Sequence, residues 1–135
     1  MYSKPLPRPN ADTKEFWKGC REHELRFQKC KNCDHVRWPP SVICPQCHSF
    51  EAKWIVSGGT GAIYSYVVYH IAFHPAFKKD LPYATAVVKL AEGPKILTNI
   101  DGCRPSELFC EMPVNLVWED VSETVSLPKF TPFKD

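Results

Sequence analysis

Four of the seven cysteines in this 135-residue chain form two closely spaced pairs, and these pairs constrain the fold more than any other feature. Cys30 and Cys33 form the first C-x2-C pair, Cys44 and Cys47 form the second, and ten residues separate them. Two such turns can direct four thiolates at one point, which is the geometry of a tetrahedral metal site. Because four thiolates leave no open coordination position, the spacing predicts one structural zinc ion.

The remaining cysteines and the neighbouring histidines do not alter this prediction. An odd cysteine count with paired spacing favours a metal over a disulfide framework. Iron held by the same thiolates stays open as an alternative, and it would make the site a rubredoxin-like electron-transfer centre. His35 and His48 lie beside the pairs, but four cysteines already complete the coordination. Cys20, Cys103 and Cys110 show no pairing pattern, so we interpret them as small buried apolar side chains.

The chain before and around the cysteines predicts an arm, a helix and a ribbon. Residues 1–23 combine a proline-rich extended arm with a helix from about Asp12 to Glu22, for which Asp12 and Glu15 resemble a capping box. Residues 24–57 alternate apolar and polar side chains in short strands around both pairs, which is typical of a zinc ribbon. Asp34 and His48 directly follow the pairs, where left-handed backbone is expected.

Residues 58–127 predict a second module made of strands. Glycines at 58, 59 and 61 indicate a hinge into it, and five runs rich in aromatic and β-branched residues follow, at 62–71, 83–90, 96–100, 114–118 and 122–127. A segment at 104–112 between the third and fourth runs can hold one helical turn. Five strands with this insertion predict an OB-fold barrel and hence a mainly β protein. Residues 128–135 are expected to form an extended apolar tail, which either docks on another chain or folds back over the barrel.

Charge and hydropathy narrow the choice of partners. The formal net charge is +2, and basic residues are scattered along the chain with no run longer than Lys78-Lys79, so nucleic acid is not implied. No apolar stretch approaches the roughly 20 residues that span a bilayer, and residues 2–10 lack the hydrophobic core of a signal peptide. We therefore expect a soluble, cytoplasmic protein without a membrane partner.

One loop of the second module combines aromatic side chains with positive charge. Phe73, His74, Phe77, Lys78 and Lys79 lie between the first two predicted strands of the barrel. Lysine binds phosphate as a compact cation, and the aromatic rings could flank an adenine, so the loop is a candidate acyl-CoA or partner surface. A solvated loop whose rings cover the barrel end is the competing interpretation.

The order of motifs along nearly the whole chain resembles a known family. These motifs are Phe16-Trp17, the two cysteine pairs with Pro39-Pro40 between them, Gly61 with Tyr64-Ser65-Tyr66, Leu81-Pro82-Tyr83, the segment from Val87 to Gly93, Met112-Pro113-Val114 and Leu127-Pro128-Lys129-Phe130. Together they resemble the zinc-ribbon and OB-fold proteins associated with acyl-CoA enzymes, often encoded beside thiolases. Asp34 and His48 replace glycines that are common after the cysteine pairs of this family.

The resemblance implies a noncatalytic accessory subunit in a hetero-oligomer. Such subunits bind thiolase-fold or hydratase-fold partners and help to form the acyl-CoA channel, and Phe130 in the tail would belong to this partner surface. The family includes partners of enzymes that degrade aromatic compounds and steroid side chains, so a thiolase acting on a bulky acyl-CoA is among the expected partners; a hydratase or aldolase stays open. The absence of known catalytic motifs agrees with a binding role and indicates no catalytic residue.

A different class of function also stays open. OB-folds and zinc ribbons recur in proteins that bind single-stranded nucleic acid, and Tyr64, Tyr66, Tyr69 and Phe73 could offer stacking surfaces.

Overall fold

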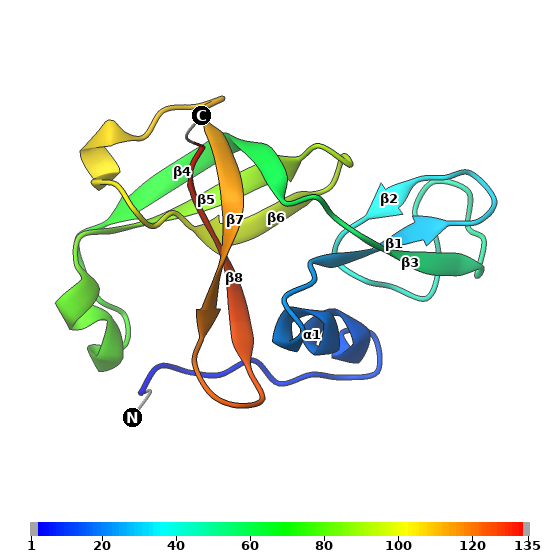
Figure 1. The fold of residues 1–135 in the computed structure, drawn as a ribbon, viewed down its shortest axis with the longest axis horizontal. Helices are drawn as coiled ribbons and strands as arrows, with labels where there is room; N and C mark the ends of the chain where they lie inside the picture. Colours follow the sequence, from blue (N-terminus) through cyan, green and yellow to red (C-terminus); the bar gives the residue numbers. More distant parts are fainter. Residues whose placement is uncertain (1–2, 134–135) are drawn as a thin grey trace.

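The structure, a computed structural model, describes residues 3–133 and consists mainly of β-strands (Figure 1). In chain order its elements are α1 (Lys14–Arg21), β1 (Arg26–Cys30), β2 (Val36–Arg37), β3 (Ala52–Val56), β4 (Thr60–Tyr69), the 3-10 helix η1 (Pro75–Asp80), β5 (Tyr83–Leu90), β6 (Lys95–Asn99), the 3-10 helix η2 (Pro105–Glu107), β7 (Pro113–Asp120) and β8 (Ser126–Pro132). The predicted mainly β class is confirmed. Within residues 3–133 we find no helix with the length and apolar character needed to cross a bilayer.

The first sheet is the ribbon, an antiparallel sheet in the order β2-β1-β3. Phe27 of the central strand pairs with Ile55 of β3, and its side chain is fully buried. Cys30 is the last residue of β1 and pairs with Ala52. The sheet pairing of β1 therefore fixes the position of the first cysteine of the metal site.

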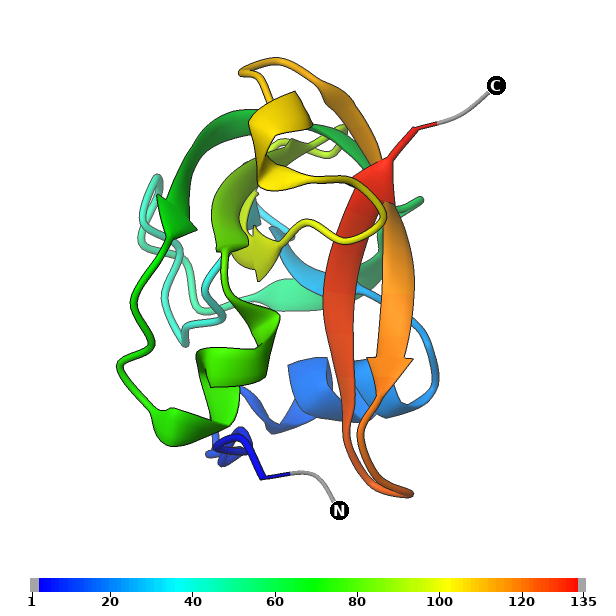
Figure 2. The ribbon, with the colours of Figure 1, turned by 90° about the vertical axis from the view of Figure 1, so that its left-hand side faces the viewer.

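The second sheet has the order β6-β5-β4-β7-β8, and each neighbouring pair of strands is antiparallel. A parallel bridge between Ile100 and Phe130 brings the end of β6 beside β8 and closes the sheet into a barrel (Figure 2). Along β5, buried residues alternate with more exposed ones, as expected for a strand with one face in a core. This closure and the helical turn η2 between β6 and β7 confirm the predicted OB-fold.

The last strand of the barrel differs from the sequence prediction. We expected it at 122–127, but β8 begins at Ser126, and the backbone nitrogens of Val121 and Ser122 instead donate to the carbonyl of Val125 in a turn. The expected tail from residue 128 is therefore sheet as far as Pro132, and the nitrogen of Phe133 still donates to Pro113. Residues 134–135 lie outside the described part of the chain.

Helix α1 is shorter than predicted and lacks the expected capping box. Its N-cap residue is Thr13, whose side chain makes no capping hydrogen bond. The side-chain oxygen of Asn10 accepts the backbone N–H groups of Asp12 and Thr13 at 2.9 and 3.0 Å. An asparagine two residues earlier in the chain thus provides the local acceptor that we had assigned to Asp12.

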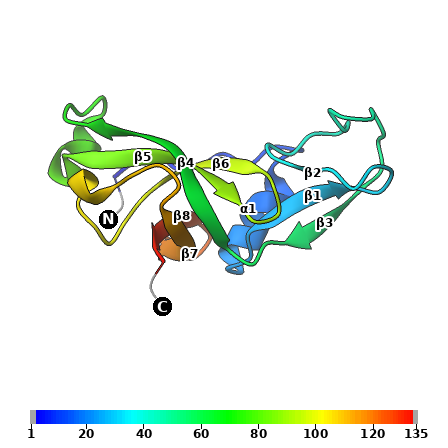
Figure 3. The same ribbon diagram turned by 90° about the horizontal axis from the view of Figure 1, so that it is seen from above.

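The apolar face of α1 packs on the rest of the same chain. Phe16 and Cys20 are fully buried, and the ring of Phe16 lies 4.3 Å from that of Trp38 in the ribbon. The helix contacts β1 of the ribbon and β8 of the barrel, and Figures 1 and 3 show it beside both modules. One continuous hydrophobic core therefore includes residues of the helix, the ribbon and the barrel.

The connection between β3 and β4 is bonded to the barrel. One carboxylate oxygen of Glu92 accepts a hydrogen bond from the hydroxyl of Ser57 at 2.7 Å, and the other accepts one from the backbone nitrogen of Gly58 at 2.9 Å. Gly59 has a φ of +80°, and a Cβ atom there would lie 2.9 Å from the Cβ of Leu116. The glycine-rich segment that we interpreted as a hinge is thus a fixed connection.

Candidate metal centre and the η1 loop

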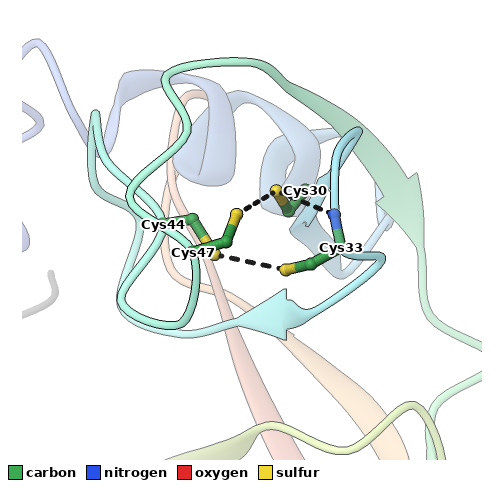
Figure 4. Close-up of side chains that lie close together, drawn as sticks. All are labelled: Cys30, Cys33, Cys44 and Cys47. Atoms are coloured by element: carbon green, nitrogen blue, oxygen red, sulfur yellow. Dashed lines mark hydrogen bonds between the residues drawn. The ribbon is translucent and has the colours of Figure 1, made fainter.

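The two cysteine turns bring four sulfur atoms together, as predicted. The Sγ atoms of Cys30, Cys33, Cys44 and Cys47 all lie within 4.8 Å of one another. The distance is 3.5 Å between Sγ of Cys30 and Cys47, and 3.6 Å between Sγ of Cys33 and Cys44 (Figure 4). Zinc–sulfur bonds of about 2.3 Å place tetrahedral sulfurs about 3.8 Å apart, so the cluster has the dimensions of a zinc cage.

Both turns have the same backbone arrangement. The nitrogen of Asp34 donates to the carbonyl of Cys30 at 3.0 Å, and the nitrogen of His48 donates to that of Cys44 at 2.9 Å. Asp34 and His48 have φ values of 65° and 64°, which confirms the left-handed backbone predicted at both positions. Among residues 3–133 the metal-ligand cluster contains only the four cysteines, so neither His35 nor His48 belongs to it.

Hydrogen-bond donors surround the sulfurs. The backbone nitrogens of Asn32 and Cys33 lie 3.4 and 3.5 Å from Sγ of Cys30. A hydrogen bond from the side chain of Asn32, together with a backbone hydrogen bond at Ser49, lowers the pKa of the Cys47 thiol to about 6. Donors of this kind favour thiolates, which is the form that binds a metal. Against a backbone hydrogen bond at His35, which lowers it, burial and the three neighbouring sulfurs raise the pKa of the Cys33 thiol to about 12, because without a metal the cluster retains a shared proton. Four thiolates at these distances fit a structural zinc ion with complete coordination.

The three other cysteines differ in their surroundings. Cys20 is buried in the core, and this burial raises the pKa of its thiol to about 12. Cys103 is half-buried, whereas Cys110 is exposed. The interpretation as a small buried side chain is therefore confirmed for Cys20 and wrong for Cys110, which lies in the loop between η2 and β7.

The structure places five predicted surface residues in one loop, residues 70–82, which we call the η1 loop. Phe73 is 84% exposed, and Lys78 and Lys79 are also exposed. His74 precedes η1, and its Nδ1 atom accepts the backbone N–H of Ala76 at 3.1 Å. Phe77 is half-buried, with the Nζ atom of Lys4 5.0 Å from its ring centroid. The loop is thus built on local contacts and presents both an aromatic ring and positive charge.

Two tyrosines, which sequence reasoning did not assign to this surface, hold the aromatic rings of the loop in place. Tyr69 and Tyr83 are register partners at the ends of β4 and β5, and their rings stack with centroids 5.1 Å apart. Phe73 meets Tyr69 edge-on at 6.1 Å, and Phe77 lies 5.7 Å from Tyr83. Both tyrosines lie next to the loop, one at the end of the first predicted strand and one at the start of the second. Paired strands place such residues opposite one another, so the sequence could have indicated their contact.

Phe130 is not a surface residue, which corrects the sequence prediction. Its side chain is 0% exposed, and it pairs with Leu116 across β7 and β8. Its carbonyl oxygen accepts the nitrogen of Asp101 at 2.8 Å, beside the bridge that closes the barrel. Phe130 therefore belongs to the core and cannot contact a partner or acyl-CoA in this fold.

A cavity of about 550 Å³ lies between the N-terminal arm, η1 and the ends of β6 and β8. On its floor, Nζ of Lys129 lies 3.1 Å from Oδ1 of Asn99 and 3.3 Å from Oε2 of Glu119. Lys4 closes one side through an ion pair with Asp80. Sequence reasoning missed this cavity because its walls come from five segments that are far apart in the chain: the arm, the η1 loop with the start of β5, the end of β6 with the loop after it, β7 and β8.

A zinc ribbon joined to an OB-fold barrel defines the class of protein. Residues 17–51 match the family described as "ChsH2, rubredoxin-like zinc ribbon domain", and residues 54–119 match "ChsH2, C-terminal OB-fold domain". A "DUF35 domain-containing scaffold protein" of Methanocaldococcus jannaschii is 36% identical over 79% of this chain and 77% of its own length. The chain belongs to this DUF35 family of zinc-ribbon and OB-fold proteins.

Two further similarities extend over nearly the whole chain. A "probable enoyl-CoA hydratase alpha subunit" of Thermomonospora curvata is 37% identical over 96% of this chain, which spans only 40% of that relative's length. The solved structure named "Ltp2-ChsH2(DUF35) aldolase" superimposes with a TM-score of 0.86 at 37% identity, and the match covers 94% of this chain and 98% of that one. The resemblance inferred from the motifs is therefore confirmed at the level of the family.

Proposed function

We propose that this protein is a noncatalytic, zinc-containing subunit that binds a thiolase-fold catalytic subunit in the cytoplasm and takes part in acyl-CoA binding or complex assembly. The closed thiolate cage supports a structural role for the metal, because four sulfur ligands leave no position for a substrate. The names of the relatives also support a subunit role: one is called a scaffold protein, and another belongs to an aldolase named with two components.

The single observation that carries the proposal is the exposure of Phe73. This ring is 84% exposed, although the other rings around it pack on one another, and Ile71 beside it is 69% exposed. Aromatic side chains that project from a rigid support are typical anchors of protein interfaces. The η1 loop is therefore the proposed contact with the catalytic subunit.

The lysines of the same loop support the acyl-CoA part of the proposal. Lys78 and Lys79 are exposed in the last turn of η1, a few residues from Phe73. Lysine is suited to phosphate as a compact cation, so these side chains can bind CoA phosphates at the edge of the interface. The substrate in this proposal is an aromatic or otherwise bulky acyl-CoA that the catalytic subunit processes.

Co-expression with a thiolase-fold protein from the same organism, chosen from the genes next to this one, tests the proposal. Light scattering after gel filtration is expected to show a hetero-oligomer, and the F73S substitution is expected to weaken it by about tenfold or more. L97S is the matched control, because Leu97 is a similarly exposed apolar side chain on β6. K78E/K79E is expected to leave assembly largely intact and to raise the KM for acyl-CoA. A chain that elutes alone beside its neighbour would contradict the proposal.

The alternative of single-stranded nucleic-acid binding has less support from the aromatic side chains. The hydroxyl of Tyr66 donates to the carbonyl of Leu108 at 2.9 Å, and Nζ of Lys95 lies 3.9 Å from the ring centroid of Tyr64. The ring of Tyr69 stacks on Tyr83. Other side chains therefore cover one face of the Tyr64 ring and one face of the Tyr69 ring, and Tyr66 is held to the backbone by its hydroxyl, whereas base stacking needs free faces. Tight oligonucleotide binding at low salt that falls steeply with salt would favour this alternative.

A further inference from the structure

The N-terminal arm, residues 3–9, is held by the polar contacts of one side chain. Nζ of Lys4 lies 2.5 Å from Oδ2 of Asp80 in η1, and 5.0 Å from the ring centroid of Phe77 in the same helix. Within residues 3–9 only Lys4 makes an ion pair, a hydrogen bond or a ring contact, and backbone hydrogen bonding begins at Asn10. The position of the arm therefore depends on Lys4.

Asp80 depends on the same contact. Its Oδ2 atom is buried, and apart from the ammonium group of Lys4 it has no polar partner among residues 3–133. The side chains of Lys4 and Asp80 are 18% and 35% exposed, so water reaches this pair less than a pair on an open surface. Solvent and salt screen such a pair less, and loss of one partner leaves the other charge uncompensated.

The arm lies across the space between η1 and the strands β7 and β8. The cavity of about 550 Å³ beside η1 is lined by Lys4 and Pro5, and a second cavity of about 420 Å³ is lined by Ser3 and Lys4. Both cavities also share Asp80 and Glu119. Figures 1 and 2 show the arm beginning beside η1 and passing the turn between β7 and β8 on its way to α1. The arm thus runs between two neighbouring cavities.

The surroundings of Lys4 are acidic. The other charged residues that line the two cavities are the lysines Lys79 and Lys129 and the carboxylates Asp80, Asp101, Glu119 and Asp120. Without Lys4 the walls therefore have two negative charges in excess, and a cation is favoured at this place. Pro5 and Pro7 fix an extended backbone on the C-terminal side of Lys4, which lowers the entropy that the arm loses when it binds.

The contact of Lys4 also joins η1 to a distant part of the chain. Apart from the contacts of Lys4, the hydrogen bonds within residues 70–82 stay inside the η1 loop: Phe77 donates to His74 at 3.0 Å and Leu81 donates to Lys78 at 3.4 Å. On one side η1 packs through the ring of Phe77 on Tyr83. On the other side it is held by Lys4.

From these observations we propose that the N-terminal arm is a latch for the η1 loop. Lys4 holds η1 against the barrel through Asp80 and Phe77, and so fixes the orientation in which the loop presents Phe73 and its two exposed lysines. Loss of the ion pair releases the arm and η1 together. Lys4 positions the loop and touches no ligand itself. The importance of the latch for the catalytic subunit rests on the proposed function; the latch itself does not.

Amide hydrogen exchange in the full-length, zinc-loaded protein, measured by NMR, tests the latch without any partner. K4M keeps a long unbranched side chain but removes its charge. R8M is the matched control, because Arg8 is an exposed cation of the same arm and makes no polar contact. We expect the backbone N–H of Phe77 to exchange about tenfold faster in K4M and at an unchanged rate in R8M. An unchanged rate in K4M would overturn the proposal.

Three further variants separate the ion pair from a general effect on the arm. K4R keeps the charge and the position over the Phe77 ring, so it is expected to retain slow exchange. D80N is expected to accelerate exchange as K4M does, and the double variant K4M/D80N should add little to either single variant, because both remove the same contact. Additive effects of K4M and D80N would overturn the proposal, as would fast exchange in K4R.

The same variants in the complex distinguish the latch from the proposed function. If the hetero-oligomer forms, K4M is expected to weaken it by less than F73S does, whereas R8M and K4R leave it unchanged. If it forms equally well with K4M although K4M accelerates exchange, the latch stands and its role in partner binding fails. If no hetero-oligomer forms, the proposed function fails, and hydrogen exchange alone decides on the latch.

Discussion

The imidazole ring of His23 stacks on the indole of Trp118, with centroids 5.3 Å apart and planes inclined by 5°. His23 follows α1, has a φ of 61° and reaches β7 of the barrel, where its Nε2 atom lies 2.7 Å from Oδ1 of Asp120. This contact joins the end of the helix to the barrel. His23 itself is exposed and lies beyond Arg21, the last helical residue.

Asp120 is expected to make the fold sensitive to acid. Hydrogen bonds from Ser126 and then from His23 lower the pKa of this carboxyl below its ordinary value of 3.8. Because the pKa is lower in the folded chain, ionised Asp120 stabilises the fold above about pH 4, and this stabilisation is lost as the pH falls through the folded pKa. D120N should therefore reduce the loss of stability in urea unfolding between pH 7 and pH 3. E123Q, in the adjacent turn, should leave that loss unchanged.

Removal of the metal is expected to disorder the ribbon. Structural zinc contributes about 10–16 kcal/mol in small zinc peptides, so a chelator or the C44S substitution should cost this protein several kcal/mol. Elemental analysis should give one zinc per chain in colourless protein, and the tryptophan fluorescence of Trp38 and Trp54 should change when the metal is removed. C110S alters an exposed cysteine and should retain metal and stability. Red protein with bound iron would contradict the zinc assignment.

Phe130 provides a direct test of the corrected barrel. F130A should lower the free energy of unfolding by about 3–5 kcal/mol, because it removes a fully buried ring. F133A, three residues further along, changes a ring that is 49% exposed and should cost clearly less. Chemical unfolding monitored by circular dichroism measures both. Similar costs for the two variants would indicate that the segment after residue 127 does not form the last strand.

We expect a side chain at Gly59 to destabilise the fold. G59A places a methyl group 2.9 Å from Leu116 at a φ of +80°, so we expect a loss of about 1–3 kcal/mol in unfolding free energy. At Gly58 the nearest atom to an added Cβ is 3.9 Å away, and G58A should cost less than about 0.5 kcal/mol. A G59A variant as stable as G58A would show that the connection is more adaptable than its geometry indicates.

The sequence predicted the metal cage and the two modules, because both depend on local patterns. The spacing of the cysteines and the left-handed positions of Asp34 and His48 need only short-range geometry. The last strand was misplaced because Pro128 and Pro132 suggested a break. Proline is compatible with an edge strand, and β8 pairs fully with only one neighbour, β7.

Other features depend on contacts that no local pattern encodes. Phe130 near the end of the chain suggested a docking residue, but the bridge beside it to Ile100 places it in the core. In the sequence Arg37 is one of many scattered basic residues. Only the fold shows that its side chain is buried and that its Nη1 atom has no hydrogen-bond partner among residues 3–133. The cavity beside η1 likewise needs the arm, the barrel and the loop together.

The carboxylate of Glu92, bonded to both Ser57 and Gly58, has a consequence for assembly. These hydrogen bonds connect the ribbon to the barrel at one place. Helix α1, which contacts both β1 and β8, connects them at a second place. With these two attachments, the fold sets the span between the tip of the ribbon and the η1 end of the barrel. A partner protein that contacts both tips therefore has to match that span.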